Sequence, residues 1–282
     1  MPDTQYYLGE HQKIFEKQAT WLADQRDALN IKFVIHLGDM TNNNTIGEWR
    51  VVDRVMKHLD GVVPYSSMPG NHDGIRRGIT NSVNYNQFFG IDRFAGRDYY
   101  GGHFGDTNDS NYSFFDIGGM EFMVLSLAFG TPQEQLDWAN EVLAQHPDKR
   151  TIFATHTYLD DDGTRLDRNE EYGVEDPLMR WNDGTQIWDK VLRRHANLFM
   201  TVCGHVPGET YFTSRGDADN VVHEIMANYQ GWPNGGDGYL RILRFSPATD
   251  KIHVIAYSPW LDRTLDHPAH SFVLDYEMPD PR

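Results

Sequence analysis

The chain has 282 residues, of which 39% are hydrophobic and 13% aromatic, so it can bury a full core and is not disordered throughout. Its 25 basic and 41 acidic side chains give a formal net charge of −16, which disfavours binding to nucleic-acid polymers and anionic membranes. The single cysteine, Cys203, excludes an intramolecular disulfide and a cysteine-ligated metal cluster, whereas 13 histidines leave other metal sites open.

The first two thirds of the sequence alternate predicted helices and strands. Apolar residues at seven-residue spacing predict a helix over 10–29, and a buried strand follows over 32–37. The next predicted elements are a helix over 47–59, strands over 62–68 and 120–127, a helix over 132–144, a strand over 150–154, a helix over 185–194 and a strand over 198–202. The segment 74–112 lacks such periodicity and is predicted to be a long loop that serves as a functional insertion or rim. A second predicted loop, over 157–183, is acidic.

The last third has a different pattern, because helical periodicity disappears. Short apolar runs predict successive, mostly antiparallel strands over 210–213, 221–227, 239–245, 252–257 and 271–276. We find neither a linker nor an internal repeat, so we predict a single α/β domain over residues 1–282. The sequence indicates no oligomeric state.

Four predicted strands end in a polar residue that could carry chemistry. These residues are Asp39, Asn71, His156 and His205. Because the carboxyl ends of neighbouring strands in an α/β sheet open on one crevice, we expect the four side chains to converge. One carboxylate, one amide oxygen and two imidazoles suit a divalent metal such as Mn, Fe or Zn. A glycine precedes three of the four residues and would permit close approach of the backbone.

Five motifs follow one another along the chain: Asp3-Thr4-Gln5, Gly38-Asp39, Gly70-Asn71-His72-Asp73, His156 and Gly204-His205-Val206-Pro207. In this order they resemble the motifs of the calcineurin-like metallophosphoesterases. The opening Asp-Thr-Gln is similar to that of a bacterial branch of this family. The resemblance covers residues 3–207. It implies two facing mixed β-sheets flanked by helices, and hydrolysis of a phosphoester with divalent metal ions.

The resemblance also implies a role for each motif residue. Asp39 would bridge two metal ions, and the second metal site would be completed by Asn71, His156 and His205. His72 would be the outer-sphere acid near the leaving group, and Asp73 would orient its imidazole.

Two residues depart from the family pattern, and both fall at the first metal site. Gln5 replaces the histidine of Asp-x-His, and Pro207 replaces the second histidine of Gly-His-x-His. The site would keep Asp3, Asp39 and the Gln5 amide oxygen, and oxygen donors favour Mn, Mg or Ca. We therefore expect one tight metal (Mn, Fe or Zn) and one weaker ion. Only Met1 and Pro2 precede Asp3, so the first strand is expected to be truncated.

The predicted function is metal-dependent hydrolysis of a small phosphoester, a monoester or a diester, by a metal-activated water with His72 as the acid. Two alternatives stay open: a one-metal promiscuous esterase, and a binding module of the same fold that has lost catalysis. Near the centre, Tyr158 is the predicted aromatic neighbour. His36, on a buried strand, is predicted to pack in the core.

Membrane insertion is not predicted, because no stretch reaches the ~18 apolar residues that a spanning helix needs. A signal peptide is not predicted either, because Met1-Pro2-Asp3 leads directly into polar sequence. We expect either a cytoplasmic protein or, if a leading segment was removed, an extracytoplasmic one.

Overall fold

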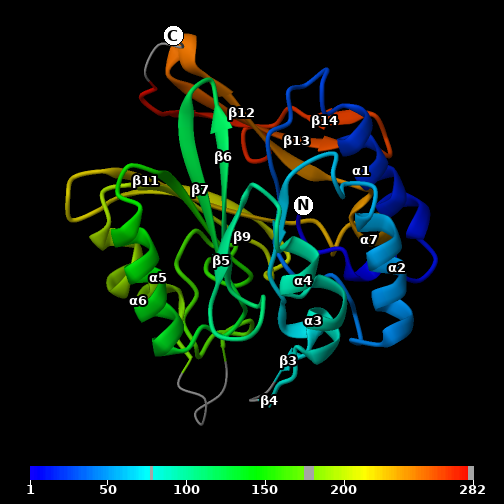
Figure 1. Ribbon diagram of the computed structural model, residues 1–282. Helices are drawn as coiled ribbons and strands as arrows, with labels where there is room; N and C mark the ends of the chain where they lie inside the picture. The colour runs from blue at the N-terminus through cyan, green and yellow to red at the C-terminus, as the bar shows by residue number, and fades with distance from the viewer. Residues whose placement is uncertain (77–78, 175–180, 279–282) are drawn as a thin grey trace.

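Helices and strands alternate along the first part of the chain in the computed structural model, which describes residues 1–76, 79–174 and 181–278 (Figure 1). The described helices are α1 (Gln12–Asp24), α2 (Ile46–Met56), α3 (Val83–Phe89), α4 (Ile91–Phe94), α5 (Gln133–Gln145), α6 (Gly184–Lys190) and α7 (Pro233–Gly236), with 3₁₀ turns η1 (Gln5–Tyr7), η2 (Asn71–Asp73), η3 (Leu192–Arg194) and η4 (Pro247–Thr249). None of the described helices is both long and apolar enough to cross a bilayer.

The described strands are β1 (Val34–His36), β2 (Tyr65–Ser67), β3 (Ile75–Arg76), β4 (Ile79–Thr80), β5 (Tyr100–His103), β6 (Asn111–Ile117), β7 (Met120–Leu127), β8 (Arg150–Thr155), β9 (Leu198–Cys203), β10 (Gly208–Arg215), β11 (Val221–Asn228), β12 (Leu240–Ser246), β13 (Lys251–Ser258), β14 (Arg263–Leu265) and β15 (Phe272–Asp275). From β10 onward the described strands pair mostly antiparallel, as predicted.

Two layers of β-structure face each other. The larger is a seven-stranded mixed sheet with the order β10-β11-β9-β8-β7-β6-β5, in which β7, β8, β9 and β11 run parallel. The other layer holds the parallel pair β1-β2 and an antiparallel group in which β13 pairs with β12, β14 and β15. The predicted α/β fold with two facing layers is confirmed, although the second layer is divided into two groups of strands.

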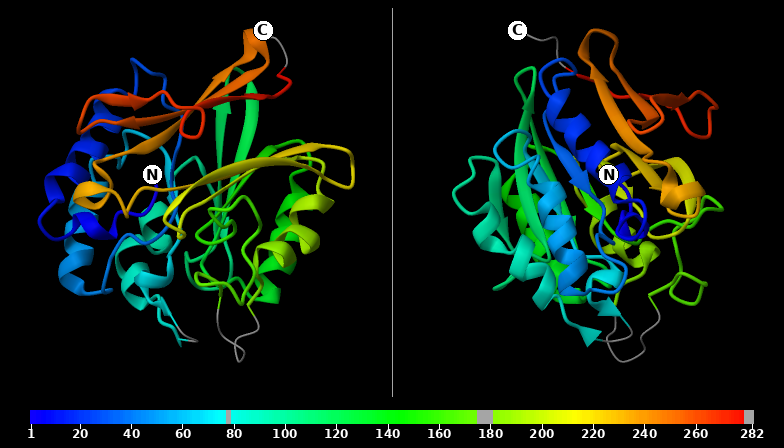
Figure 2. Two further views of the ribbon diagram at one scale, coloured as in Figure 1. Left: turned by 180° about the vertical axis from the view of Figure 1, so that it is seen from behind. Right: turned by 90° about the vertical axis from the view of Figure 1, so that its right-hand side faces the viewer.

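The space between the layers is filled with apolar side chains. Phe122 and Ile152 of the large sheet share a buried cluster with Ile252 and Val254 of β13. Helices α5 and α6 cover the other face of the large sheet, and α1 and α2 pack against β1-β2 on the opposite side of the molecule (Figure 2). Because each fully buried side chain of this size contributes about 1.5–3 kcal/mol, the strand ends are held by a stable core.

Two helices begin with a capping box, in which side chain and backbone exchange hydrogen bonds across one turn. In α2 the Thr45 hydroxyl accepts from the Glu48 N–H. In α6 the Asp183 carboxylate accepts from the Gln186 N–H at 2.9 Å. These caps satisfy backbone donors that a helix start leaves unpaired, which fixes where both helices begin.

The segment predicted as a loop over 74–112 is largely ordered into helices and strands. Its described part contains β3, β4, α3, α4, β5 and the start of β6, whereas residues 77–78 lie outside the described residues. Tyr85 and Phe89 of α3 are fully buried and pack on Trp49 of α2. The prediction was wrong because a composition rich in Gly, Asn and Tyr resembles a loop, whereas here the aromatic residues form the buried face of a short helix.

The second predicted loop, 157–183, contains no helix or regular strand in its described residues 157–174 and 181–183. Residues 175–180 lie outside the described residues.

The start of the chain runs beside β1 without forming a regular strand. The Met1 carbonyl accepts from the Leu37 N–H at 3.0 Å, and the Thr4 N–H donates to the Asp39 carbonyl at 3.1 Å. The two bonds place Asp3, which lies between them, next to the carboxyl end of β1.

Candidate metal centre

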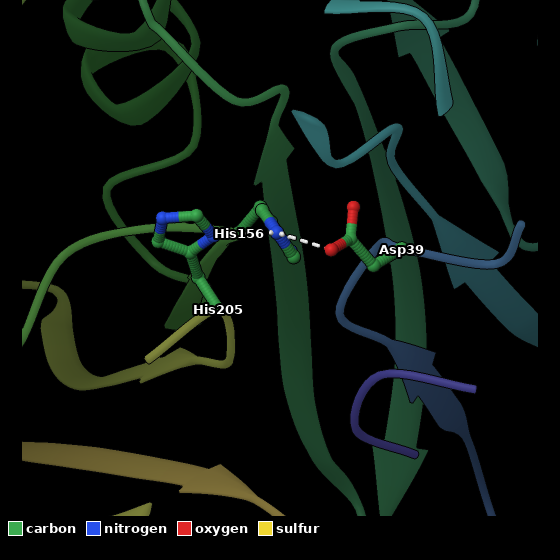
Figure 3. Close-up of side chains that lie close together, drawn as sticks. All are labelled: Asp39, His156 and His205. Carbon is green, nitrogen blue, oxygen red and sulfur yellow. Dashed lines mark hydrogen bonds and ion pairs between the residues drawn. The ribbon is translucent and has the colours of Figure 1, made fainter. Parts of the chain in front are cut away.

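Side chains from four strand ends meet at one edge of the parallel strands, and Figure 3 shows three of them, Asp39, His156 and His205. Asp39 follows β1, and Asn71 begins the turn η2 after β2. His156 and His205 follow β8 and β9. The His156 Nε2 atom lies 3.4 Å from Asp39 Oδ2 and 3.1 Å from Asn71 Oδ1. It lies 3.2 Å from His205 Nδ1, so the predicted convergence is observed. Ligand atoms of Asp39, His156 and His205 all lie within 4.8 Å of one another.

Both imidazoles have one nitrogen bonded to the backbone and the other facing the cluster. His156 Nδ1 donates to the Leu37 carbonyl at 2.7 Å, and His205 Nε2 donates to the Tyr172 carbonyl at 2.9 Å. A carbonyl oxygen can only accept, so these outer nitrogens carry a proton. The inner nitrogens are therefore the ones that can hold a metal ion, with the outer hydrogen bonds setting the orientation of each ring.

The cluster concentrates negative charge in a buried place. Asp3 and Asp39 are 3% and 1% exposed, and Asp3 Oδ1 lies 3.9 Å from His156 Nε2. Burial raises the pKa of Asp3 to about 7. Burial also opposes ionisation of Asp39, but the charge and hydrogen bond of His156 outweigh it and lower the Asp39 pKa to about 2.

The same interactions act on the histidines. Burial works to lower the pKa of His156, but the attraction of Asp39 outweighs it and raises that pKa to about 9. Burial lowers the pKa of His205 to about 3, so His205 is neutral. A proton on His156 and a divalent cation are thus alternative ways to neutralise the two buried carboxylates, and the donor set fits such a cation.

Glycines permit the close approach of these strand ends. A Cβ atom on Gly70 would lie 2.2 Å from Asp39 Oδ1, and one on Gly204 would lie 2.3 Å from Asp3 Oδ2. Asp39 and His205 themselves have φ angles of 48° and 69°. Residues other than glycine rarely adopt this left-handed region, and such strained positions gather at functional sites.

We expect Gly70→Ala to disrupt the centre. The added methyl group would meet Asp39 Oδ1 at 2.2 Å and the Asp39 backbone nitrogen at 2.5 Å, so the loop after β1 has to move. The expected cost is about 1–3 kcal/mol of folding stability, together with at least a tenfold loss of metal affinity. Denaturant unfolding and metal analysis after dialysis measure both. Gly9→Ala is the matched control, because no atom of the described residues lies within 4 Å of its Cβ position. Normal metal content in Gly70→Ala would contradict this account of the packing.

His72 lies at the cleft beside the cluster. Its backbone N–H donates to Asp39 Oδ1 at 2.8 Å, and its Nδ1 donates to the Asn42 carbonyl at 2.7 Å. Because Nδ1 is taken and the side chain lines the cleft, Nε2 is the nitrogen available to a bound molecule.

Asp73 does not orient the His72 imidazole, contrary to the prediction. Its buried carboxylate accepts from the backbone N–H groups of Met40, Thr41 and Gly70 at 3.0, 2.8 and 3.0 Å, and from the Thr41 hydroxyl at 2.8 Å. It therefore joins the loop after β1 to the loop after β2. In a 3₁₀ turn such as η2, adjacent side chains point in different directions, so neighbours in sequence need not touch.

A cleft of about 370 Å³ opens onto the centre. Its lining residues outside the predicted motifs include Tyr6, Phe129, Tyr172, Trp181 and Gln230. The Phe129 ring covers both imidazoles, with centroid distances of 5.9 Å to His156 and 5.2 Å to His205. Sequence reasoning missed Phe129, although it follows β7 and so lies at the same edge as His156.

Tyr158 is not the aromatic neighbour of the centre, contrary to the prediction. It is fully buried, its hydroxyl donates to Glu224, and Arg165 donates to that hydroxyl at 2.9 Å. After His156 the chain leaves the edge of the sheet and enters the cluster beneath α6, which takes Tyr158 away from the cleft.

The two remaining predicted ligands, Asp3 and Gln5, are both buried. The Asp3 oxygens accept from the His205 N–H only at 3.3 and 3.4 Å. Gln5 is 2% exposed, and its amide oxygen has no hydrogen-bond partner among the described residues. A buried acceptor left unpaired costs about 1–3 kcal/mol, so this oxygen fits a role as a ligand. The role of Asp3 and Gln5 as ligands of a first metal position stays a prediction.

His36 is fully buried, as predicted. Its Nδ1 accepts from the Gly38 N–H at 3.3 Å, and its Nε2 lies 3.1 Å from the Thr4 hydroxyl. The two ring nitrogens thus connect β1 to the Thr4 side chain and to the Gly38 backbone.

Comparisons with known proteins give the same picture. A family model described as calcineurin-like phosphoesterase matches residues 3–209. One curated relative, the uncharacterized protein YvnB of Bacillus subtilis (strain 168), is 35% identical over 270 residues, which are 93% of this chain and 20% of that protein. The chain thus spans about a fifth of the length of this relative.

Two solved structures share the fold. A dimetal phosphatase from Danio rerio has a TM-score of 0.58 at 13% identity, over 95% of this chain and 90% of that one. The purple acid phosphatase PPD1 from yellow lupin (Lupinus luteus) seeds has a TM-score of 0.55 at 14% identity, over 93% of this chain and 49% of that one.

Proposed function

This chain belongs to the calcineurin-like phosphoesterase family, and from this we propose that it hydrolyses a small phosphoester, a monoester or a diester, with the help of divalent metal ions. The observation that carries the proposal is the buried convergence of Asp39, His156 and His205, with an inner nitrogen of each imidazole facing the cluster. A structural role alone would not call for two neighbouring imidazoles beside a buried carboxylate.

The proposed ligands fall into two groups that share Asp39. Asn71, His156 and His205 would hold one ion, and Asp3 with Gln5 would hold the other. Divalent ions held there would polarise a phosphoryl oxygen and lower the pKa of a water molecule so that it can act as the nucleophile.

Two further side chains would assist the reaction. In its doubly protonated imidazolium form, His72 would donate the Nε2 proton to the departing oxygen and become neutral, while its Nδ1–H stays bonded to the Asn42 carbonyl. Since the His72 N–H also donates to Asp39 Oδ1, the acid is held at a fixed distance from the shared ligand. Phe129, which covers both imidazoles, would keep bulk water from that side of the centre.

The proposal is tested with bis-p-nitrophenyl phosphate and p-nitrophenyl phosphate. We expect the purified protein to release p-nitrophenol from at least one of them when Mn²⁺ is present, to stop after chelation and to recover when Mn²⁺ is restored. The Asp39→Asn variant, purified in parallel, controls for contaminating phosphatases. Failure of the metal-replete protein to turn over either ester would contradict the proposal and favour a binding module. Hydrolysis of p-nitrophenyl acetate alone would favour the one-metal esterase.

A further inference from the structure

Aromatic side chains line the cleft that opens onto the metal centre. Two of them are tyrosines that stay accessible, Tyr6 and Tyr172, which are 46% and 37% exposed. Phe129 and Trp181 also line the cleft, but they are buried and pack on each other with their ring centroids 5.7 Å apart. The two tyrosines are therefore the aromatic rings that the organic part of a bound molecule can cover.

Tyr172 is fixed beside the centre by its backbone and by its ring. Its carbonyl accepts from His205 Nε2 at 2.9 Å. Its ring lies edge to face against the His205 ring, with the centroids 6.0 Å apart and the planes at 89°. A phosphoester bound at the centre would thus carry its organic group next to Tyr172.

Tyr6 reaches the same cleft from the start of the chain, where it is the middle residue of the turn η1. Gly235 of α7 packs closely against it, because a Cβ atom on Gly235 would lie 3.0 Å from Tyr6 Cβ. Gly235 also has a φ angle of 77°, which glycine adopts without strain. The packing holds the base of the Tyr6 side chain and leaves its ring exposed at the cleft.

The cleft is also negatively charged. The described residues that line it include two carboxylates, Asp39 and Glu171, and neither a lysine nor an arginine. Glu171 directly precedes Tyr172 and is exposed to solvent. Burial raises the pKa of the Tyr172 hydroxyl, and the negative charges of Glu171 and Asp161 raise it further. The field around Tyr172 therefore favours a cationic organic group over a neutral or anionic one.

We propose that this cleft selects phosphoesters whose organic part carries a quaternary ammonium group, with the rings of Tyr6 and Tyr172 and the carboxylate of Glu171 as its contacts. The inference rests on the proposed function, because it specifies the substrate class of the same site. A quaternary ammonium group has no N–H to donate, so the face of an aromatic ring and a nearby carboxylate attract it without leaving a donor unsatisfied. A neutral aromatic group could stack on the tyrosines but would gain nothing from Glu171.

The first experiment measures binding without turnover. The phosphonate analogue of phosphorylcholine is compared, by calorimetry on the Mn²⁺-loaded protein, with its neutral isostere, in which a carbon atom replaces the quaternary nitrogen. Both have a P–C bond that a phosphoesterase does not hydrolyse, and they differ in the positive charge alone. We expect the cationic phosphonate to bind about tenfold more tightly or better.

The second experiment measures turnover of the matching pair of esters. These are p-nitrophenyl phosphorylcholine and the p-nitrophenyl ester of the neutral isostere. Because both release p-nitrophenol, the ratio of their kcat/KM values reports recognition of the organic group. We expect this ratio to favour the cationic ester by about tenfold or more.

Variants assign the preference to its residues. Glu171→Gln, Tyr172→Leu and Tyr6→Leu should each lower the ratio by about threefold or more. A variant that only distorted the centre would lower kcat/KM for both esters and leave their ratio as it was. Tyr172→Leu keeps the backbone carbonyl that accepts from His205. Glu141→Gln, at an exposed position of α5, is the control for loss of one acidic residue and should not change the ratio.

Equal binding of the two phosphonates, no measurable binding of either, or a ratio that all three variants leave unchanged would overturn the inference. Its failure is distinguishable from failure of the proposed function, since the phosphonates are not turned over. Tighter binding of the cationic phosphonate by a protein that hydrolyses no phosphoester would refute the function and keep the inference. Phosphoester hydrolysis without a preference for the cation would do the reverse.

Discussion

Asp39→Asn is expected to remove most of the bound metal and to lower phosphoester turnover by more than about 100-fold. Asp39 is the carboxylate shared by both proposed metal positions. Its Oδ2 lies 3.4 Å from His156 Nε2, and its Oδ1 accepts from the His72 N–H at 2.8 Å. The substitution keeps the shape of the side chain but removes its charge and one acceptor, so both positions weaken together.

Elemental analysis and turnover of a p-nitrophenyl phosphoester, measured on the same preparation, check this prediction. Asp92→Asn, an exposed acidic residue in α4, is the control for a general change in net charge. A variant that kept its metal stoichiometry would show that Asp39 does not bridge two ions.

His72→Ala is expected to keep the metal and to lose about 10²–10⁴-fold in turnover. The metal should stay because the His72 ring is bonded to the Asn42 carbonyl and faces the cleft, outside the cluster. The loss should depend on the leaving group. An alkyl phosphoester, whose departing oxygen needs a proton, should suffer more than a p-nitrophenyl ester, whose departing oxygen does not.

Steady-state rates on the two substrates and metal content of the variant test this prediction. His267→Ala, an exposed histidine, is the matched control. If metal-replete His72→Ala retained full activity on the alkyl ester, His72 would have no part in proton transfer.

The strand ends were predictable because one topological rule governs them. Residues that follow parallel strands meet at one edge of the sheet. We could therefore predict the convergence of Asp39, Asn71, His156 and His205, although they lie far apart along the chain. The glycines beside them carried a second signal, since only a missing Cβ allows Asp39 and Gly70 to approach this closely.

Other features of the site depend on where a side chain points or on how a strand pairs, and a sequence pattern specifies neither. Asp73 follows His72, but the turn η2 sends its carboxylate to the backbone of Met40 and Thr41. Gln230 was missed because β11 was predicted only as one of several antiparallel strands, whereas it also pairs parallel with β9. The helix α3 was missed because its burial comes from aromatic packing over a length too short for a clear period.

The contact between Asp3 and His205 spans 202 positions of the chain, which has a consequence for the order in which the protein is made. At a synthesis rate of about 5–20 residues per second, Asp3 is polymerised roughly 10–40 s before His205. Closing so long a loop costs chain entropy that only the packed sheets can offset. A nascent chain that stops before the end of β9 therefore lacks His205. A metal ion that needs the complete set of proposed ligands can bind only after the sheet has formed as far as β9.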